Sequence, residues 1–415
     1  MKSDSIKPGL GSPSSRLDYL DATRAFALVL GVIFHASLSF MPVFIGWAVQ
    51  DVSTSPVLSY FLAVSHSFRM ATFFLLAGFF GHLTFHRRGA ASFLRTRLVR
   101  IGVPFVVGWF LLKPLVVSGW IMGGASMRGD FAFWPAVRDG FASLSTLPEE
   151  LFLQTHLWFL YYLLVITGLT LVLRAGVKRW AATADRVVNN LLRSRWAVAI
   201  FATPLALLLG QMQTWGVDTP DRSLWPHGPV LLVYGGFFCL GWLIDRQPEL
   251  LAELGRLSIA RGLQAALSIG IVLLLTPMQM DPGHPQFQLA HWVYVSSYAV
   301  MMWCLVGLTI GVFRKWFRQS RTWVRYVADS SYWMYLIHLP VVVWLQVAVA
   351  EWPLHWSLKL GFISMVTISF ALLTYDLFVR STWVGLILNG RRRDRGLARW
   401  FPRRASGSEI KRHLG

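Results

Sequence analysis

The sequence has few charged residues and almost no cysteine. Only 14% of its 415 residues are Asp, Glu, Lys or Arg, whereas about 25% are charged in a typical soluble domain. Its two cysteines, Cys239 and Cys304, lie in apolar segments, without the spacing of metal ligands or of a disulfide framework. The chain also lacks a phosphate-binding loop, an HExxH sequence and a catalytic-serine motif. These absences exclude a soluble enzyme built on any of those motifs, and we expect no metal site.

The chain is instead rich in long apolar segments. Hydrophobic residues make up 55% of it, and its mean hydropathy is +0.50. A helix needs about 20 mostly apolar residues to cross a bilayer. The pattern predicts an all-α fold, a polytopic membrane helix bundle of about ten transmembrane helices, at 20–42, 57–83, 101–121, 155–173, 196–213, 228–245, 261–278, 291–313, 332–350 and 357–379.

Lysine and arginine are distributed unevenly among the connections. Beginning with the N-terminal tail, alternate tails and connections hold 32 of them, and the intervening connections hold 3. By the positive-inside rule this places both termini in the cytoplasm. It also explains the net charge of +19 without a nucleic-acid partner. We expect a disordered tail at 1–18, a transmembrane domain at 19–380 and a basic tail at 381–415 that contacts anionic lipid.

The first expected span carries three ionisable side chains close to one face. Arg24 and His35 are eleven residues apart, about 20° beyond three full helical turns, and Asp21 is about 40° from His35 on the other side. Ionisable groups inside a span are costly and mark function by default. Arg24 and His35 are roughly 16 Å apart along the axis, so this stripe runs from the cytoplasmic side past the bilayer middle. Asp21 lies too far from His35 to contact it, and we expect it to pair with Arg24.

An arginine in the second span reaches about the depth of His35. His66 and Arg69 are three residues apart and share a helix face. A buried arginine keeps its proton, so Arg69 must face a carboxylate, a group of carbonyls, water or an anionic substrate. We expect His35, His66 and Arg69 to form the catalytic group.

A pair of arginines precedes the third expected span. Arg97 and Arg100 are three residues apart at the expected cytoplasmic mouth. Two guanidinium groups on one face suit phosphate groups, which they grip in bidentate fashion. The same spacing also fits simple positive-inside anchors, and both interpretations stay open.

Further polar residues lie near other helix ends. His156 begins the fourth expected span and His338 lies in the ninth. Each is either an interhelical hydrogen-bonding residue or part of a site. Pro340 has no N–H to give to the carbonyl of Leu336, so a local kink is expected there. The long connection 122–154 either caps an outward-facing cavity or only links two helices.

These residues together resemble the acyltransferase type 3 family of integral-membrane enzymes. That family has an arginine, ten intervening residues and a histidine in its first helix, which Arg24 and His35 match, and an R-x-x-R pair before its third helix, which Arg97 and Arg100 match. The resemblance covers nearly the whole chain. Within the family the chain is most similar to enzymes that succinylate osmoregulated periplasmic glucans, through Tyr19-Leu-Asp21, His66-Ser-Phe-Arg-Met70, His156-Leu-Trp-Phe159 and Tyr335-Leu-Ile-His338-x-Pro340.

The resemblance implies a multi-pass protein of the bacterial inner membrane. Its donor substrate would be cytoplasmic acyl-CoA, either succinyl-CoA or acetyl-CoA, and its acceptor a sugar hydroxyl of a periplasmic glucan. No permanently bound cofactor is expected. We expect Arg97 and Arg100 to hold the phosphates of the donor, with Arg24 and Asp21 further in, and His35 to take the hydroxyl proton.

Three other functions remain as alternatives. One is O-acetylation of another envelope or exported polysaccharide. A second is a proton-coupled transporter or a glycan flippase, which intramembrane ionisable groups would also suit. A third is a structural subunit of an envelope-polysaccharide complex, but such a role leaves the stripe on the first span and the arginine pair unexplained.

Overall fold

The computed structural model describes residues 18–396 except 128, 130–131, 147–153, 177, 215, 280, 282 and 318–320. The described residues form helices and loops without a β-strand, so the predicted all-α helix bundle is confirmed. Of the expected tails at 1–18 and 381–415, residues 1–17 and 397–415 lie outside the described residues, whereas 381–396 are described and contain a short helix. The long helices are α1 (Asp18–Ser37), α2 (Val57–Arg97), α3 (Val103–Ser126), α5 (Trp158–Gly176), α8 (Gly228–Arg246), α10 (Ile259–Gln279), α11 (Phe287–Trp316), α12 (Thr322–Val349) and α13 (Trp356–Thr374).

The ten expected spans all fall in helical segments. In the described ranges, eight helical stretches are long and apolar enough to cross a membrane, or nine if one bent pair of helices counts as a span. One of the eight, 57–126, contains two expected spans. The bent pair is α6 (Ala181–Arg193) with α7 (Ala197–Leu209), which meet at 108°. With 13 residues, α7 is only about 20 Å long, so it is shorter than the hydrocarbon core of a bilayer.

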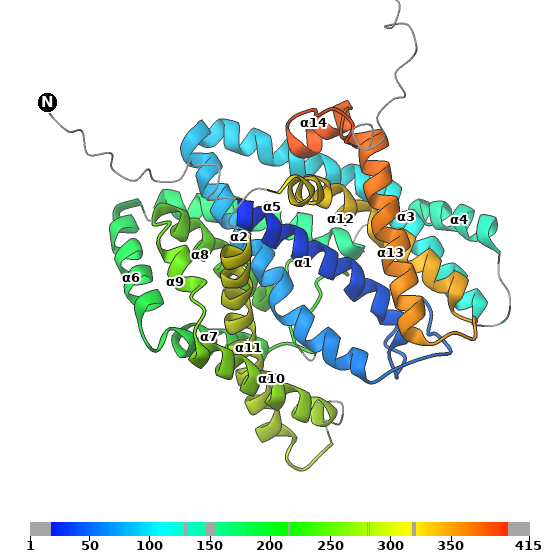
Figure 1. Ribbon diagram of the computed structural model, residues 1–415, viewed down its shortest axis with the longest axis horizontal. Coiled ribbons are helices and arrows are strands. Elements are labelled where there is room, and N and C mark those ends of the chain that lie inside the picture. Colours follow the sequence, from blue (N-terminus) through cyan, green and yellow to red (C-terminus); the bar gives the residue numbers. More distant parts are fainter. Residues whose placement is uncertain are drawn as a thin grey trace, which may run out of the picture.

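The connection between the second and third spans differs from the expected loop at 84–100. Helix continues through this region and is interrupted only at Gly89, whose φ of 75° and ψ of 169° are not helical. Glycine has no Cβ and adopts such a φ readily, so one residue suffices to change the chain direction. Arg97 and Arg100 therefore lie within helical turns that lead directly into α3, and not in a flexible loop (Figure 1).

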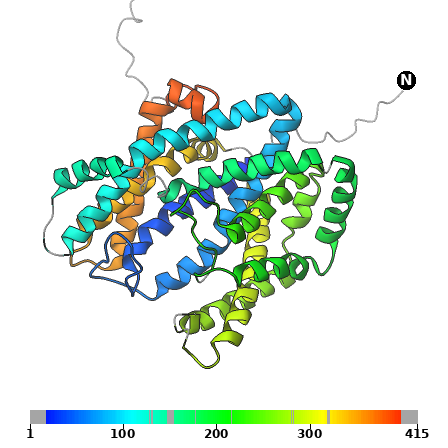
Figure 2. The ribbon, with the colours of Figure 1, turned by 180° about the vertical axis from the view of Figure 1, so that it is seen from behind.

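Helix α1 lies in the middle of the bundle. It contacts α2, α11, α12 and α13, and Figures 1 and 2 show it crossing the centre of the bundle in views from opposite sides. Its Ala and Gly residues permit this close packing, and ten of its 20 residues are buried. The polar stripe on α1 is therefore held inside the protein and does not face lipid.

Two lysines within the expected spans have roles away from this stripe. The Lys359 Nζ lies 2.7 Å from Asp51 Oδ1, and both side chains are 1% exposed. Burial raises the pKa of the Asp51 carboxyl, and the Lys359 ammonium opposes that rise. This pair ties the α1–α2 loop to α13. Lys113 lies over the ring of Trp109, with Nζ 4.5 Å from the ring centroid.

The described part of the long connection between α3 and α5 packs against α3 and α12. Its helix α4 (Phe133–Ala142) packs against α3, where Gly140 meets the carbonyl of Pro114. Phe133 contacts Trp344 of α12, with ring centroids 5.4 Å apart. The segment 147–153, which holds Pro148 and the two glutamates that follow it, lies outside the described residues.

Candidate active site

A cavity of about 450 Å³ lies between α1, α2, α5 and α12. Its volume is in the usual range for small-molecule sites. All nine side chains that the sequence singled out lie on its wall, in two groups. The arginine end of the cavity has Asp21, Arg24, Arg97 and Arg100. The histidine end has His35, His66, Arg69, His156 and His338.

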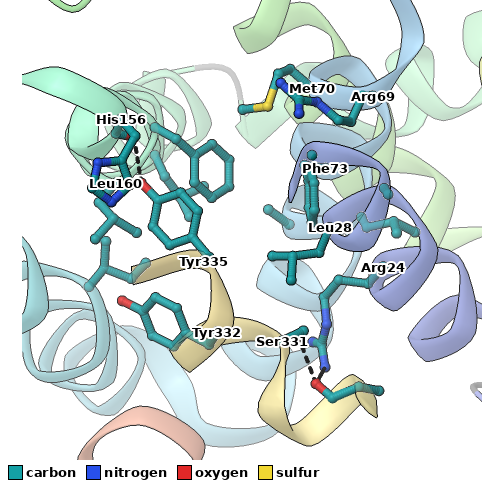
Figure 3. Close-up of a pocket in the computed structure, with 18 of the residues that line it drawn as sticks. Arg24, Leu28, Arg69, Met70, Phe73, His156, Leu160, Ser331, Tyr332 and Tyr335 are labelled. Carbon is teal, nitrogen blue, oxygen red and sulfur yellow. Dashed lines mark hydrogen bonds between the residues drawn. The ribbon is translucent and has the colours of Figure 1, made fainter. Parts of the chain in front are cut away.

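At the arginine end, backbone carbonyls hold the guanidinium groups in place. Arg24 lies 3.2 Å from the Asp21 carboxylate and donates to the carbonyl of Ala328 at 3.2 Å (Figure 3). Arg97 donates to the carbonyl of Ala77 at 3.2 Å. Arg100 lies in a π-helical turn, Leu98–Gly102, of a kind that is frequent at functional sites. These four residues present three positive charges and one carboxylate to the cavity.

Between the two ends the wall is mainly apolar. Figure 3 shows Leu28 and Phe73 between Arg24 on one side and Arg69 on the other, with Leu160 and Tyr335 on the facing wall. These four side chains form a neck between the two ends of the cavity, and none of them is charged. An extended, mostly uncharged chain is the kind of ligand that fits such a neck, with a charged group at its arginine end.

The rings of three histidines from three helices meet at the histidine end. The ring centroids of His35 and His338 are 5.2 Å apart, and those of His338 and His156 are 5.4 Å apart. His66 instead stacks on Phe34, with ring centroids 5.5 Å apart. Trp47 of the α1–α2 loop stacks on His35 at 6.0 Å. The sequence could place each histidine on a helix but could not show that three of them meet.

Hydrogen bonding separates His35 from the other two. His156 Nε2 lies 2.9 Å from the carbonyl of Leu336 and His338 Nδ1 lies 2.7 Å from the carbonyl of Tyr335, so each donates a proton to a backbone oxygen. His35 Nδ1 is buried and has no hydrogen-bond partner in the described part of the chain. His156 is thus an interhelical hydrogen-bonding residue, whereas His35 has an unengaged ring nitrogen. This unengaged nitrogen makes His35 a candidate for proton transfer within the cavity.

Pro340 makes the His156 contact available. Because proline has no N–H, the Leu336 carbonyl lacks its helical partner. His156 supplies the missing donor from the 3₁₀ turn that precedes α5, and Tyr335 donates from its hydroxyl to the His156 carbonyl at 2.7 Å. Two hydrogen bonds therefore fix the start of α5 on α12, beside His338.

Replacing Pro340 with alanine is expected to release the His156 ring. The new N–H at position 340 would compete for the Leu336 carbonyl, and the loss of one buried hydrogen bond of about 1 kcal/mol should lower the transfer rate about fivefold. Nitrogen NMR of histidine-labelled protein would show a shift of the His156 ring signals. Pro204→Ala in α7 is the matched control, since Pro204 is also inside a helix but not on the cavity. Unchanged His156 signals in Pro340→Ala would contradict the assignment.

Arg69 is a buried cation without a counterion. Arg69 is only 5% exposed, and its guanidinium lies 4.4 Å from the Phe34 ring centroid. It forms no ion pair within the described ranges. Gly31 leaves room for it, because a Cβ at that position would lie 2.7 Å from Arg69 Nη1. A buried charge of this kind is costly unless an anion joins it. An anion or water in the cavity would supply the partner that this guanidinium lacks among the described residues.

Sequence reasoning missed part of the wall. Tyr332 and Tyr335 of α12 line the cavity, as do Asp329, Asn389 and Arg391. Tyr335 is three residues from His338 on the same helical face, so its spacing could have indicated it. The sequence did not distinguish Arg391 from its neighbours, because a basic run after the last span is expected from topology alone. Among the described residues, no three His, Cys, Asp or Glu side chains come together as metal ligands would.

The fold and the cavity define a polytopic helical membrane protein with an enclosed histidine–arginine site. Comparison with known families gives its class. The acyltransferase domain family matches residues 17–374, and the chain belongs to this family, the acyltransferases of type 3. It is therefore a membrane acyltransferase, which favours an enzyme over a transporter or a structural subunit.

Individual relatives agree with this family. The chain is 24% identical over 388 residues to glucans biosynthesis protein C of Escherichia coli K12, covering 91% of this chain and 96% of the relative. It has the same identity and coverage with the protein of that name from Escherichia coli O157:H7. No solved structure matches the chain.

Proposed function

We propose that the protein transfers a succinyl group from cytoplasmic succinyl-CoA to a sugar hydroxyl of a periplasmic glucan. The observation that carries the proposal is the single cavity that joins the arginine end to the histidine end through an apolar neck. The phosphates of the donor bind the arginines, the pantetheine arm occupies the neck, and the thioester lies beside His35. The uneven distribution of lysine and arginine supports a cytoplasmic arginine end in the bacterial inner membrane.

The chemistry at the histidine end is a direct acyl transfer. Neutral His35 removes the proton from the sugar hydroxyl as the oxygen attacks the thioester carbonyl carbon. The resulting tetrahedral intermediate collapses, the carbon–sulfur bond breaks, and the protonated imidazole returns its proton to the leaving thiolate. The histidine ends the cycle unchanged, so no permanently bound cofactor is needed. His66 contacts the Phe34 ring, as Arg69 does, and contributes to the polar wall around this reaction.

Arg69 supports succinyl as the acyl group. A succinyl thioester carries a free carboxylate, and an acetyl thioester carries none. The unpaired guanidinium near His35 offers that carboxylate a buried, bidentate partner. The acceptor is supported by the relatives that are named glucans biosynthesis protein C.

Analysis of periplasmic glucans by mass spectrometry tests this proposal. We expect glucans from a deletion strain to lack a succinyl mass that the parent strain has, and expression of the wild-type chain to restore it. Expression of His35→Ala, at equal membrane abundance, should not restore it. Loss of an acetyl mass instead would point to O-acetylation, and an unchanged acyl pattern on every envelope glycan would contradict acyl transfer to a glycan.

A further inference from the structure

The chain beyond α13 folds back over the arginine end of the cavity. Helix α14 (Trp383–Asn389) lies beside the start of α12 and the π-helical turn of Arg100 (Figure 1). Asn389 and Arg391 are both on the wall of the cavity that Arg97 and Arg100 also line. This segment follows residue 374, where the family match ends. It therefore adds to the cavity something that the family comparison does not assign.

Specific contacts hold this segment in place. Asn389 Nδ2 donates to the carbonyl of Asp329 and to the hydroxyl of Tyr375, both at 3.1 Å. Gly390 ends the helix in a left-handed conformation with φ of 72°, and the Arg100 guanidinium packs directly against it, where a Cβ would overlap. The position of Arg391, one residue further, is thus set relative to Arg100.

Arg391 is held more loosely than Arg393. Its guanidinium is 3.6 Å from the Asp329 carboxylate, and its side chain is 61% exposed. Arg393 binds the same carboxylate more closely, at 2.6 Å. If Arg391 turned toward a ligand, Asp329 would keep a cationic partner. Arg391 can therefore bind an incoming anion without leaving a buried charge behind.

We propose that Arg391 completes, with Arg100 and Arg97, the site for the phosphates of the acyl-CoA donor, and that it binds the 3′-phosphate of the ribose. This rests on the proposed use of acyl-CoA. The depth of the three arginines in the cavity gives this assignment. Arg97 and Arg100 are partly buried, whereas Arg391 is exposed at the opening. The nucleotide end of the donor is furthest from the thioester, so its terminal phosphate meets the outermost arginine. Arginine forks suit phosphate oxygens at each position.

Binding of CoA and of 3′-dephospho-CoA to the purified full-length protein tests the inference. The wild type should bind CoA about 10- to 100-fold more tightly, the usual value of a hydrogen-bonded charge pair. In Arg391→Ala the affinity for CoA should fall by this factor and that for dephospho-CoA should hardly change, so the preference disappears. Arg392→Ala is the matched control, since it removes the same charge from an exposed neighbour that does not line the cavity.

The possible failures are distinguishable. A wild type that binds neither compound overturns the CoA donor, and this inference with it. A wild type that binds both equally overturns the 3′-phosphate site alone. Retention of the wild-type preference in Arg391→Ala, or an equal loss of preference in Arg392→Ala, overturns the role of Arg391 and leaves the donor intact.

Discussion

Replacing His35 with alanine should lower the rate of acyl transfer by about 10²–10⁴-fold, the usual contribution of a general base. The ring is buried, its Nδ1 has no hydrogen-bond partner in the described part of the chain, and it lies at the end of the neck where the thioester is placed. At the same end, His156 and His338 each donate one ring N–H to a backbone carbonyl, which fixes the position of each ring. The measurement is turnover of acyl-CoA by purified protein with a glucan acceptor.

Two controls separate loss of the base from loss of the fold. His86→Ala changes an exposed histidine of α2 that does not line the cavity, and should retain wild-type turnover. Added imidazole should restore part of the activity of His35→Ala, because the deleted ring leaves a space of its own shape. If His35→Ala keeps wild-type turnover in a folded, membrane-inserted protein, the base is another group.

The local part of this site could be predicted from the sequence. Helical periodicity is short-ranged, so it placed Asp21, Arg24 and His35 on one face of α1, and the cost of burying them indicated a function. Apolar segments of sufficient length located the helices for the same reason. The helix that continues through 84–100, apart from Gly89, could not be predicted in this way, because the five arginines and the glycine of this segment are equally consistent with a cytoplasmic loop.

The long-range part of the site could not be predicted. The meeting of His35 with His338 depends on how α1 packs on α12, and helical periodicity carries no information about that packing. The free carbonyl of Leu336 was foreseeable from Pro340, but its partner, His156, comes from a distant segment. Arg391 shows a different limit, because many arginines in such tails serve topology alone and nothing local distinguishes one that turns toward a cavity.

Replacing Arg69 with methionine should lower kcat/KM for succinyl-CoA by about 10²–10³-fold, because the buried carboxylate of the donor would lose its only charged partner. The same change should lower kcat/KM for acetyl-CoA much less, since an acetyl group has no carboxylate to bind. Methionine keeps a long apolar side chain against Phe34, so packing there is largely preserved. Kinetics with both donors on the same preparation give the ratio directly.

Gly31→Ala provides a test that leaves the charge of Arg69 in place. The added methyl would lie 2.7 Å from Arg69 Nη1 and must displace the guanidinium from its present position. The preference for succinyl-CoA should then fall in the same direction as in Arg69→Met, but less. Arg69→Lys should recover only part of the loss, because an ammonium cannot form the paired contacts of a guanidinium. An equal fall with both donors would instead assign Arg69 to the oxyanion of the tetrahedral intermediate, which succinyl and acetyl transfer share.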